Sequence, residues 1–426
     1  MMAFDLGAAI DVGATRGVIG ERIQYGRPWA HQCALPDREN HPRQAARSTS
    51  VKSAKCEKRG VLVNRRNSFD LIRLLAAGTV LFSHSFPLSG HTGAEPLTRY
   101  TQYGTLGGIA VDVFFIISGY LVAGSYLRSS GPLQFIAKRG LRLFPALWCA
   151  IFLTVCVLGP ILSPFPVSQY FMHAQTHAYL RNLFLDIRYS LPLVFASNPY
   201  PNAVNGSLWT LPLEALMYFL VMLLGMTKML TFRGCATVAI IFVGLHFVVP
   251  STVFTDNGVV FHVMLYNELT RLGVFYFTGA LFVFGSESWI KNNRLFWAMI
   301  VVLLLFSRSS IAEAITMITL PYVVIVASHW KSKAADLVTR SGDYSYGVYV
   351  YAFPVQQTVV MLIGAHATPL AVFFYSLPVT LMLAYSSWHL IENPSLRLKR
   401  FFPSPTNRLR SVIADSRKIS DPSISK

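Results

Sequence analysis

Long apolar runs, broken by short polar and basic segments, dominate this sequence from about residue 67 onward. A helix needs about 20 mainly apolar residues to cross a bilayer core of about 30 Å, and several runs approach or exceed that length. Inside a bilayer, helices satisfy all their backbone polar groups internally, so the runs predict transmembrane helices. The ten expected spans lie at roughly 69–87, 109–127, 142–162, 207–227, 233–250, 271–285, 295–307, 311–328, 344–363 and 370–391.

The predicted fold class is therefore all-α, a polytopic transmembrane helical bundle of about ten spans. The runs near 295–307 and 311–328 are short, and Glu313 interrupts them, so a single bent or re-entrant element is an alternative. Residues 1–66 are polar and basic, and we interpret them as a disordered cytoplasmic extension. Residues 67–396 form the membrane domain, and 397–426 a basic cytoplasmic tail.

Composition and charge agree with a membrane location. The chain is 53% hydrophobic and 13% charged, against about 25% charged residues in a typical soluble domain. Its net charge of +17 comes from basic residues at the chain ends and in short loops. With both termini in the cytoplasm, the denser basic clusters all fall on the cytoplasmic side, as the positive-inside rule requires. The charge therefore indicates the orientation of the chain in a membrane, and we expect no nucleic-acid partner.

The cysteines do not indicate a metal site or a disulfide framework. There are five, scattered along the chain without a CxxC pair, and three of them lie in apolar runs. We therefore expect no bound metal.

Ionisable residues inside expected spans are candidate functional residues, because a buried charge in a bilayer is costly unless it has a partner. The first span holds Arg73 and His84. Their spacing of eleven residues is about three turns and places both on one helical face, roughly 16 Å apart. An imidazole can take a proton from a hydroxyl, and a guanidinium can hold phosphates. The alternative is that Arg73 snorkels to lipid headgroups and His84 lies at the interface.

Two carboxylates are expected near the depth of His84. Asp112 lies near the outer end of the second span, where it would orient the imidazole of His84 or simply favour the helix N-terminus. Glu214 lies two turns inside the fourth span, either in a substrate pocket or as a partner of His84 or of an arginine. We therefore predict His84, Asp112 and Glu214 as catalytic residues.

A basic pair precedes the third span. Arg139 and Arg142, in the segment FIAKRGLRLFP, are three residues apart and share one helical face. Two guanidiniums there can hold the phosphates of a nucleotide-bearing donor, although charge that sets topology is an equal alternative. With Arg73 they form the predicted phosphate-binding set.

In this order, the motifs resemble the acyltransferase-3 family of bacterial membrane O-acyltransferases. The likeness covers about residues 66–396 and rests on FDLIRLLAAGTVLFSHS, GGIAVDVFFIISGYL, the basic pair before LFP, SLWTLPLE, SYGVYVYAFP and IENP. It implies that the membrane domain transfers an acyl group, usually acetyl from acetyl-CoA as co-substrate, to hydroxyls of an envelope, secreted or signalling carbohydrate. It also implies that the first-span Arg and His are essential, with no cofactor bound.

One position departs from the family pattern. A His often stands shortly before the Pro of the ninth-span motif, and Ala352 stands at that place in SYGVYVYAFP. This leaves His84 as the candidate base or as a transient carrier of the acyl group. The main alternative function is a transporter or exporter of a glycan or small solute, since intramembrane charges also line transport routes. A non-catalytic membrane subunit is a third possibility.

Overall fold

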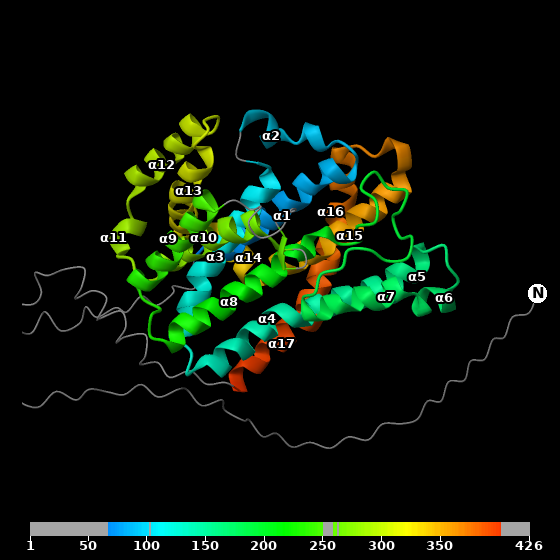
Figure 1. Cartoon of the computed structure of the whole chain (residues 1–426), viewed down its shortest axis with the longest axis horizontal. Helices are drawn as coiled ribbons and strands as arrows, with labels where there is room; N and C mark the ends of the chain where they lie inside the picture. Colours follow the sequence, from blue (N-terminus) through cyan, green and yellow to red (C-terminus); the bar gives the residue numbers. More distant parts are fainter. Residues whose placement is uncertain (1–66, 102–103, 250–258, 262–263, 402–426) are drawn as a thin grey trace, which may run out of the picture. The chain divides into compact units, whose positions relative to one another are not determined.

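The structure, a computed structural model, describes residues 67–101, 104–249, 259–261 and 264–401, and it is mainly helical (Figure 1). The predictions for 1–66 and for the tail beyond 401 lie outside these residues. The longer helices are α1 (Phe69–Leu88), α3 (Leu106–Leu127), α4 (Pro132–Leu153), α8 (Thr210–Met226), α9 (Phe232–Val248), α10 (Tyr266–Leu281), α12 (Asn293–Phe306), α13 (Ala312–His329), α15 (Ser345–Ile363) and α16 (Pro369–Ser387).

Short elements connect these helices. They are α2 (Pro96–Tyr100), α5 (Gly159–Leu162), α6 (Val167–Met172), α7 (Ala174–Tyr179), α11 (Glu287–Ile290), α14 (Lys333–Ser341) and α17 (Asn393–Arg397), with the tighter or wider turns η1 (Thr92–Ala94), η2 (Thr154–Leu158), η3 (Leu180–Phe184), η4 (Gly206–Trp209), η6 (Gly364–His366), η7 (Trp388–Glu392) and η8 (Leu398–Phe401). Two short antiparallel strands, β1 (Val259–Phe261) and β2 (Met264–Leu265), precede α10.

The all-α polytopic class is confirmed, and each of the ten expected ranges holds a helix. Within the described residues, seven helices are long and apolar enough to cross a membrane. The remaining three, α9, α10 and α12, have 17, 16 and 14 residues. The third span begins earlier than expected, at Pro132, because Pro132 starts a helix that includes the basic residues before residue 142. Helix α4 continues through η2 and α5, so that this stretch has 31 residues and ends at Leu162. The two short runs near Glu313, which could have formed a single bent element, form two separate helices, α12 and α13, that pack on each other.

The helices that carry the candidate residues pack around α1 and α3. Helix α1 contacts α3, α15 and α16, while α3 also contacts α10 and α8. Because α3 begins beside the end of α1, the two run antiparallel: Ser83 of α1 donates a hydrogen bond to the buried Glu95, which also accepts from the backbone N–H of Leu106 at 2.7 Å. Through these hydrogen bonds, Glu95 holds the end of α1 and the start of α3 together.

Two glycines bring α3 and α10 into backbone contact. A Cβ on Gly119 would lie 1.8 Å from the carbonyl oxygen of Tyr276, and one on Gly279 would lie 2.1 Å from that of Ile116. Small residues allow such close helix packing where the surroundings are as apolar as the side chains. Glycine is therefore required at both positions to hold α10 against α3.

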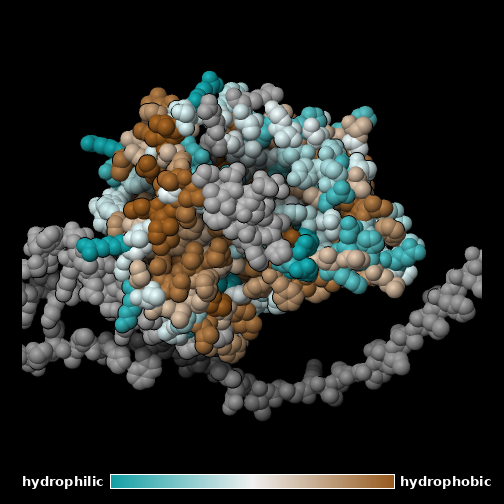
Figure 2. All heavy atoms as spheres, in the orientation of Figure 1, coloured by the Kyte–Doolittle hydropathy of each residue, from teal (hydrophilic) through white to brown (hydrophobic). Residues whose placement is uncertain are grey.

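The surface agrees with a lipid environment. Figure 2 shows apolar side chains gathered over the region where α9 and α12 lie in Figure 1. Large exposed apolar residues there include Ile240, Ile241, Val301, Leu304 and Leu305. A contiguous exposed apolar surface of this kind marks contact with a membrane or a partner.

Candidate active site

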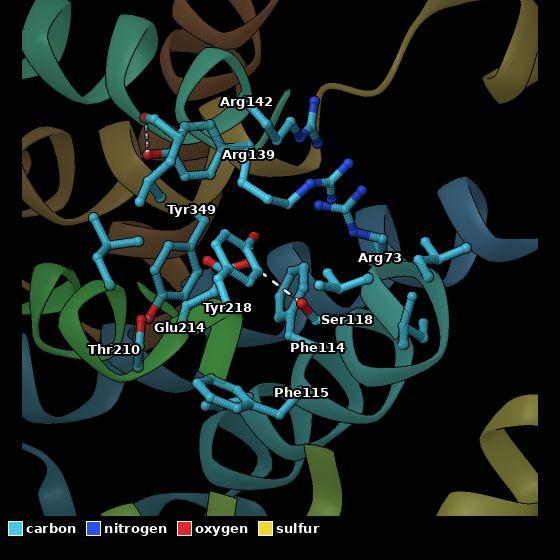
Figure 3. A pocket seen from close by; sticks show the side chains of 17 residues that line it. Arg73, Phe114, Phe115, Ser118, Arg139, Arg142, Thr210, Glu214, Tyr218 and Tyr349 are labelled. Atoms are coloured by element: carbon cyan, nitrogen blue, oxygen red, sulfur yellow. Dashed lines mark hydrogen bonds between the residues drawn. The ribbon is translucent and has the colours of Figure 1, made fainter. Parts of the chain in front are cut away.

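Three guanidiniums gather at one end of the bundle, which we call the arginine end. Arg73 lies in the second turn of α1, and Arg139 and Arg142 lie within α4, three residues apart. The three side chains extend into the same region at the edge of one cavity (Figure 3). The structure thus brings together the whole predicted phosphate-binding set.

Asp343, which sequence reasoning missed, holds two of these arginines. It lies between α14 and α15, and its carboxylate forms ion pairs with both Arg73 and Arg142. Arg142 also lies 3.6 Å from the buried carboxylate of Glu392. Burial alone would raise the pKa of Asp343, but the two guanidiniums and Ser345 hold that pKa well below its usual value. Asp343 therefore fixes Arg73 and Arg142 in place and compensates part of their positive charge.

Arg139 differs from its two neighbours. It donates a hydrogen bond to Ser125 at 3.4 Å, and its guanidinium lies 5.9 Å from the centre of the Tyr218 ring. Its Nε is buried and has no hydrogen-bond partner within the described residues. A buried donor without a partner is costly, so Arg139 is the guanidinium best placed to receive an anion.

Lys399 adds a fourth basic group. With Arg73, Arg139, Arg142 and Asp343 it lines a cleft at the arginine end. Burial and the nearby charges of Arg139, Arg142 and Lys138 lower the pKa of Lys399 to about 7. Its positive charge is present below that pH and is lost above it.

Glu214 lies in the cavity behind the arginines, which we call the arginine cavity. It accepts hydrogen bonds from Tyr218 and, at 3.4 Å, from Ser118 of α3 (Figure 3). The cavity is narrow, with a volume of about 90 Å³, and most of its wall is apolar or aromatic. Phe114, Phe115, Tyr346 and Tyr349 are among its lining residues. Glu214 is therefore a partner of hydroxyl groups and faces the same cavity as the arginines.

His84 lies toward the opposite end of α1, which we call the histidine end. Eleven residues of helix separate it from Arg73, roughly 16 Å along the axis. Its ring packs edge-on against Phe353, with the ring centres 5.4 Å apart, and its Nδ1 is buried without a hydrogen-bond partner in the described part of the chain. A second, open cavity, the histidine cavity, is lined by His84, Tyr200, Asn202, Trp209, Glu268 and Phe353, among others.

Asp112 has a different partner from the one expected. Its fully buried carboxylate pairs with Arg271 of α10 at 2.6 Å, and Arg271 also pairs with Glu268. The structure does not bring the three predicted catalytic residues into one cavity: in the described part of the chain, Glu214 lines the arginine cavity, His84 the histidine cavity, and Asp112 neither. A buried carboxylate is stabilised by the cation that lies nearest in space. Arg271 is 159 positions away from Asp112 in the sequence, so sequence spacing does not reveal this pair.

The signals for the missed residues are weak in the sequence. Asp343 directly precedes the SYGVYVYAFP motif, and Arg271 opens the sixth expected span.

Ala352, which stands where the family motif often has a His, is buried among small and aliphatic residues of α1 and α16. Within the described residues, no group of three or more His, Cys, Asp or Glu side chains is placed to hold a metal ion.

The long apolar helices and the ion pairs inside the bundle define a polytopic membrane protein. The family model of the acyltransferase domain matches residues 66–389, and the chain belongs to this acyltransferase-3 family. The chain is therefore an acyltransferase of the O-acetyltransferase type. No solved structure matches it significantly.

Three relatives match over most of their length. An O-acetyl transferase of Shigella phage Sf6 is 33% identical over 82% of this chain and 99% of its own length. Nodulation protein 10 of Rhizobium leguminosarum bv. viciae is 30% identical, over 78% and 94%. The exopolysaccharide production protein ExoZ of Rhizobium meliloti is 27% identical, over 70% and 92%.

Proposed function

We propose that this chain transfers an acetyl group from acetyl-CoA to a hydroxyl of an envelope, secreted or signalling carbohydrate. The names of the phage and exopolysaccharide relatives support both the acetyl group and the carbohydrate. We place the chain in the bacterial cytoplasmic membrane with both termini and the arginine end in the cytoplasm. Arg340 and Arg397 lie in the last turns of α14 and α17, and Lys399 lies in η8 after α17, in agreement with the positive-inside rule for that side.

The donor binds at the arginine end in this proposal. Acetyl-CoA carries several phosphates on its nucleotide, and guanidiniums bind phosphates through paired, charge-assisted hydrogen bonds. Arg139 supplies the guanidinium whose Nε has no partner within the described residues, while Arg73 and Arg142, fixed by Asp343, add two oriented positive charges. Lys399 lies in the adjoining cleft, where the nucleotide would enter.

The arrangement of the two cavities carries the proposal. The arginine cavity is lined by Thr210 and Tyr349, and the histidine cavity by the adjacent Trp209 and by Phe353, one helical turn beyond Tyr349. The cavities therefore follow one another along α8 and α15. An extended pantetheine arm anchored at the arginines would pass through the arginine cavity and present its thioester toward His84, roughly 16 Å away along α1.

The acceptor hydroxyl binds in the histidine cavity. His84 takes the hydroxyl proton as general base, and the acceptor oxygen attacks the thioester carbonyl carbon. A carbon–oxygen bond forms, the carbon–sulfur bond breaks, and the CoA thiolate leaves and takes the proton from the imidazolium. In the second route that the residues allow, the imidazole nitrogen attacks first and an acetyl-imidazole passes the group to the hydroxyl. Both routes require His84 as a neutral imidazole facing the cavity.

The test compares two matched histidine substitutions. His84→Gln and His366→Gln make the same chemical change at the same end of the bundle, and His366 is exposed and lines neither cavity. With purified enzyme, radiolabelled acetyl-CoA and the host's de-O-acetylated surface polysaccharide, we expect His84→Gln to abolish transfer and His366→Gln to retain it. Transfer retained by His84→Gln would refute the assignment of the base.

A transport assay addresses the alternative function. Enzyme reconstituted in vesicles should consume acetyl-CoA only when the polysaccharide is present, and it should move no unmodified solute. Solute flux without acetyl-CoA consumption would instead indicate a transporter.

A further inference from the structure

A third cavity at the histidine end has no part in the proposed reaction. This lateral cavity lies where α3 and α10 begin, where α9 ends and where α13 begins, and it has a volume of about 580 Å³ and is partly open. Its lining includes Thr105, His246, Phe247, Asn267, Glu268 and Glu313. It is large enough for a ligand, since small-molecule sites are typically about 300 to 1,000 Å³.

The lateral cavity adjoins the histidine cavity. Glu268, in the first turn of α10, lines both. Its carboxylate is held by Arg271, which is itself fixed by the buried Asp112. A ligand with two or more units can therefore occupy both cavities and pass Glu268 between them.

The polar groups of the lateral cavity match hydroxyl groups as ligands. His246 lies 3.2 Å from the carboxylate of Glu313 and shares a hydrogen bond of 2.8 Å with Thr270. The Glu313 side chain is still 40% exposed, and Asn267 is exposed. Carboxylates only accept hydrogen bonds, and a carboxamide both donates and accepts, so together they match the hydroxyls of a sugar.

Charge disfavours an anionic ligand. Among the described lining residues, Glu268 and Glu313 carry negative charge, and the one permanent cation, Arg271, is already paired with Glu268 and with the buried Asp112. A carboxylate or phosphate on the ligand would meet like charge at short range. Phe247, which is 51% exposed at the cavity wall, offers an apolar face for the underside of a sugar ring.

From these observations we infer that the lateral cavity is a second sugar subsite, which holds a neutral residue adjoining the one acetylated in the histidine cavity. This inference rests on the proposed function. It makes the enzyme selective for acceptors of at least two residues, with Asn267 and Glu313 as specificity-determining residues.

The experiment measures how activity depends on acceptor length. The probes are the host's de-O-acetylated surface polysaccharide and its fragments of one, two and three residues, prepared by partial acid hydrolysis. The variants are Asn267→Ala and Glu313→Gln, with His366→Ala as the control. The ratio of kcat/KM between the two-residue and one-residue fragments does not depend on the amount of folded enzyme, so it remains informative if a variant is less stable.

The wild type and the control should prefer the two-residue fragment by about 10-fold or more, as expected for hydrogen bonds to charged groups, and each variant should remove most of that preference. Equal kcat/KM for all fragments in the wild type, or an unchanged length ratio in both variants, would overturn the subsite while leaving the proposed function intact. No transfer by the wild type to the polysaccharide or any fragment would overturn the proposed function, and the subsite with it.

Discussion

Adding one methyl group at Gly119 tests the close contact between α3 and α10. In Gly119→Ala, the new Cβ would lie 1.8 Å from the carbonyl oxygen of Tyr276, whereas ordinary contact begins at 3.4 Å. Helix α10 must therefore retreat by about 1.6 Å, the difference between these distances. Because α10 carries Arg271 and Glu268, the retreat also loosens the ion pair with Asp112.

The magnitude follows from two opposing effects. Overpacking a tight interface costs about 1–3 kcal/mol. Alanine is a better helix former than glycine by about 1 kcal/mol, which offsets part of that cost. We expect Gly119→Ala to be less stable by up to about 2 kcal/mol, or up to about 3 °C in Tm for a chain of this size.

The matched control is Gly78→Ala in α1, where an added Cβ meets no atom within 4 Å. That variant should be as stable as the wild type, or more stable by up to about 1 kcal/mol. Thermal unfolding of the detergent-purified proteins, followed by intrinsic fluorescence, measures both. Equal Tm values for Gly119→Ala and Gly78→Ala would refute the close helix contact.

Three further predictions concern the charged groups. In Asp343→Asn, the guanidiniums of Arg73 and Arg142 lose the carboxylate that compensates their positive charge. We expect the free energy of unfolding to fall by about 3 kcal/mol, as measured by thermal unfolding. Unchanged stability would contradict the two ion pairs of Asp343. Lys399 loses its positive charge above pH 7, so the KM for acetyl-CoA should rise from about pH 6 to 8, and Lys399→Arg should flatten that rise; identical profiles would exclude a role in donor binding. Arg271→Leu should destabilise the fold more than the double substitution Arg271→Leu with Asp112→Leu, because only in the single substitution does a fully buried carboxylate lose its ion pair with Arg271; the reverse order in Tm would contradict this.

The apolar pattern was sufficient to predict the helices. A run of about 20 apolar residues is a strong signal because the bilayer fixes the length that a helix must have. The pattern was weaker for α10, which carries Glu268 and Arg271 in its first two turns and has 16 residues. The start of the third span was also missed, because the basic residues Arg139 and Arg142 lie inside α4 and Pro132 begins the helix.

The site was predicted in part. Residues on one helix are related by helical geometry alone, so the separation of Arg73 and His84 along α1 follows directly from their spacing. Contacts between helices depend on rotation and tilt, which sequence spacing does not give. The partners of Asp112 and Arg142, at 159 and 201 positions away, therefore appear only in the structure.

Binding of acetyl-CoA, measured apart from catalysis, tests the central claim most directly. Arg139→Gln, its control Arg340→Gln at an exposed site on the same end, and His84→Gln are compared by equilibrium binding of radiolabelled acetyl-CoA to the purified proteins. The account predicts about 10-fold weaker binding for Arg139→Gln, from the loss of a charge-assisted phosphate contact, and near wild-type Kd for the other two. Unchanged binding by Arg139→Gln together with lost binding by His84→Gln would contradict it.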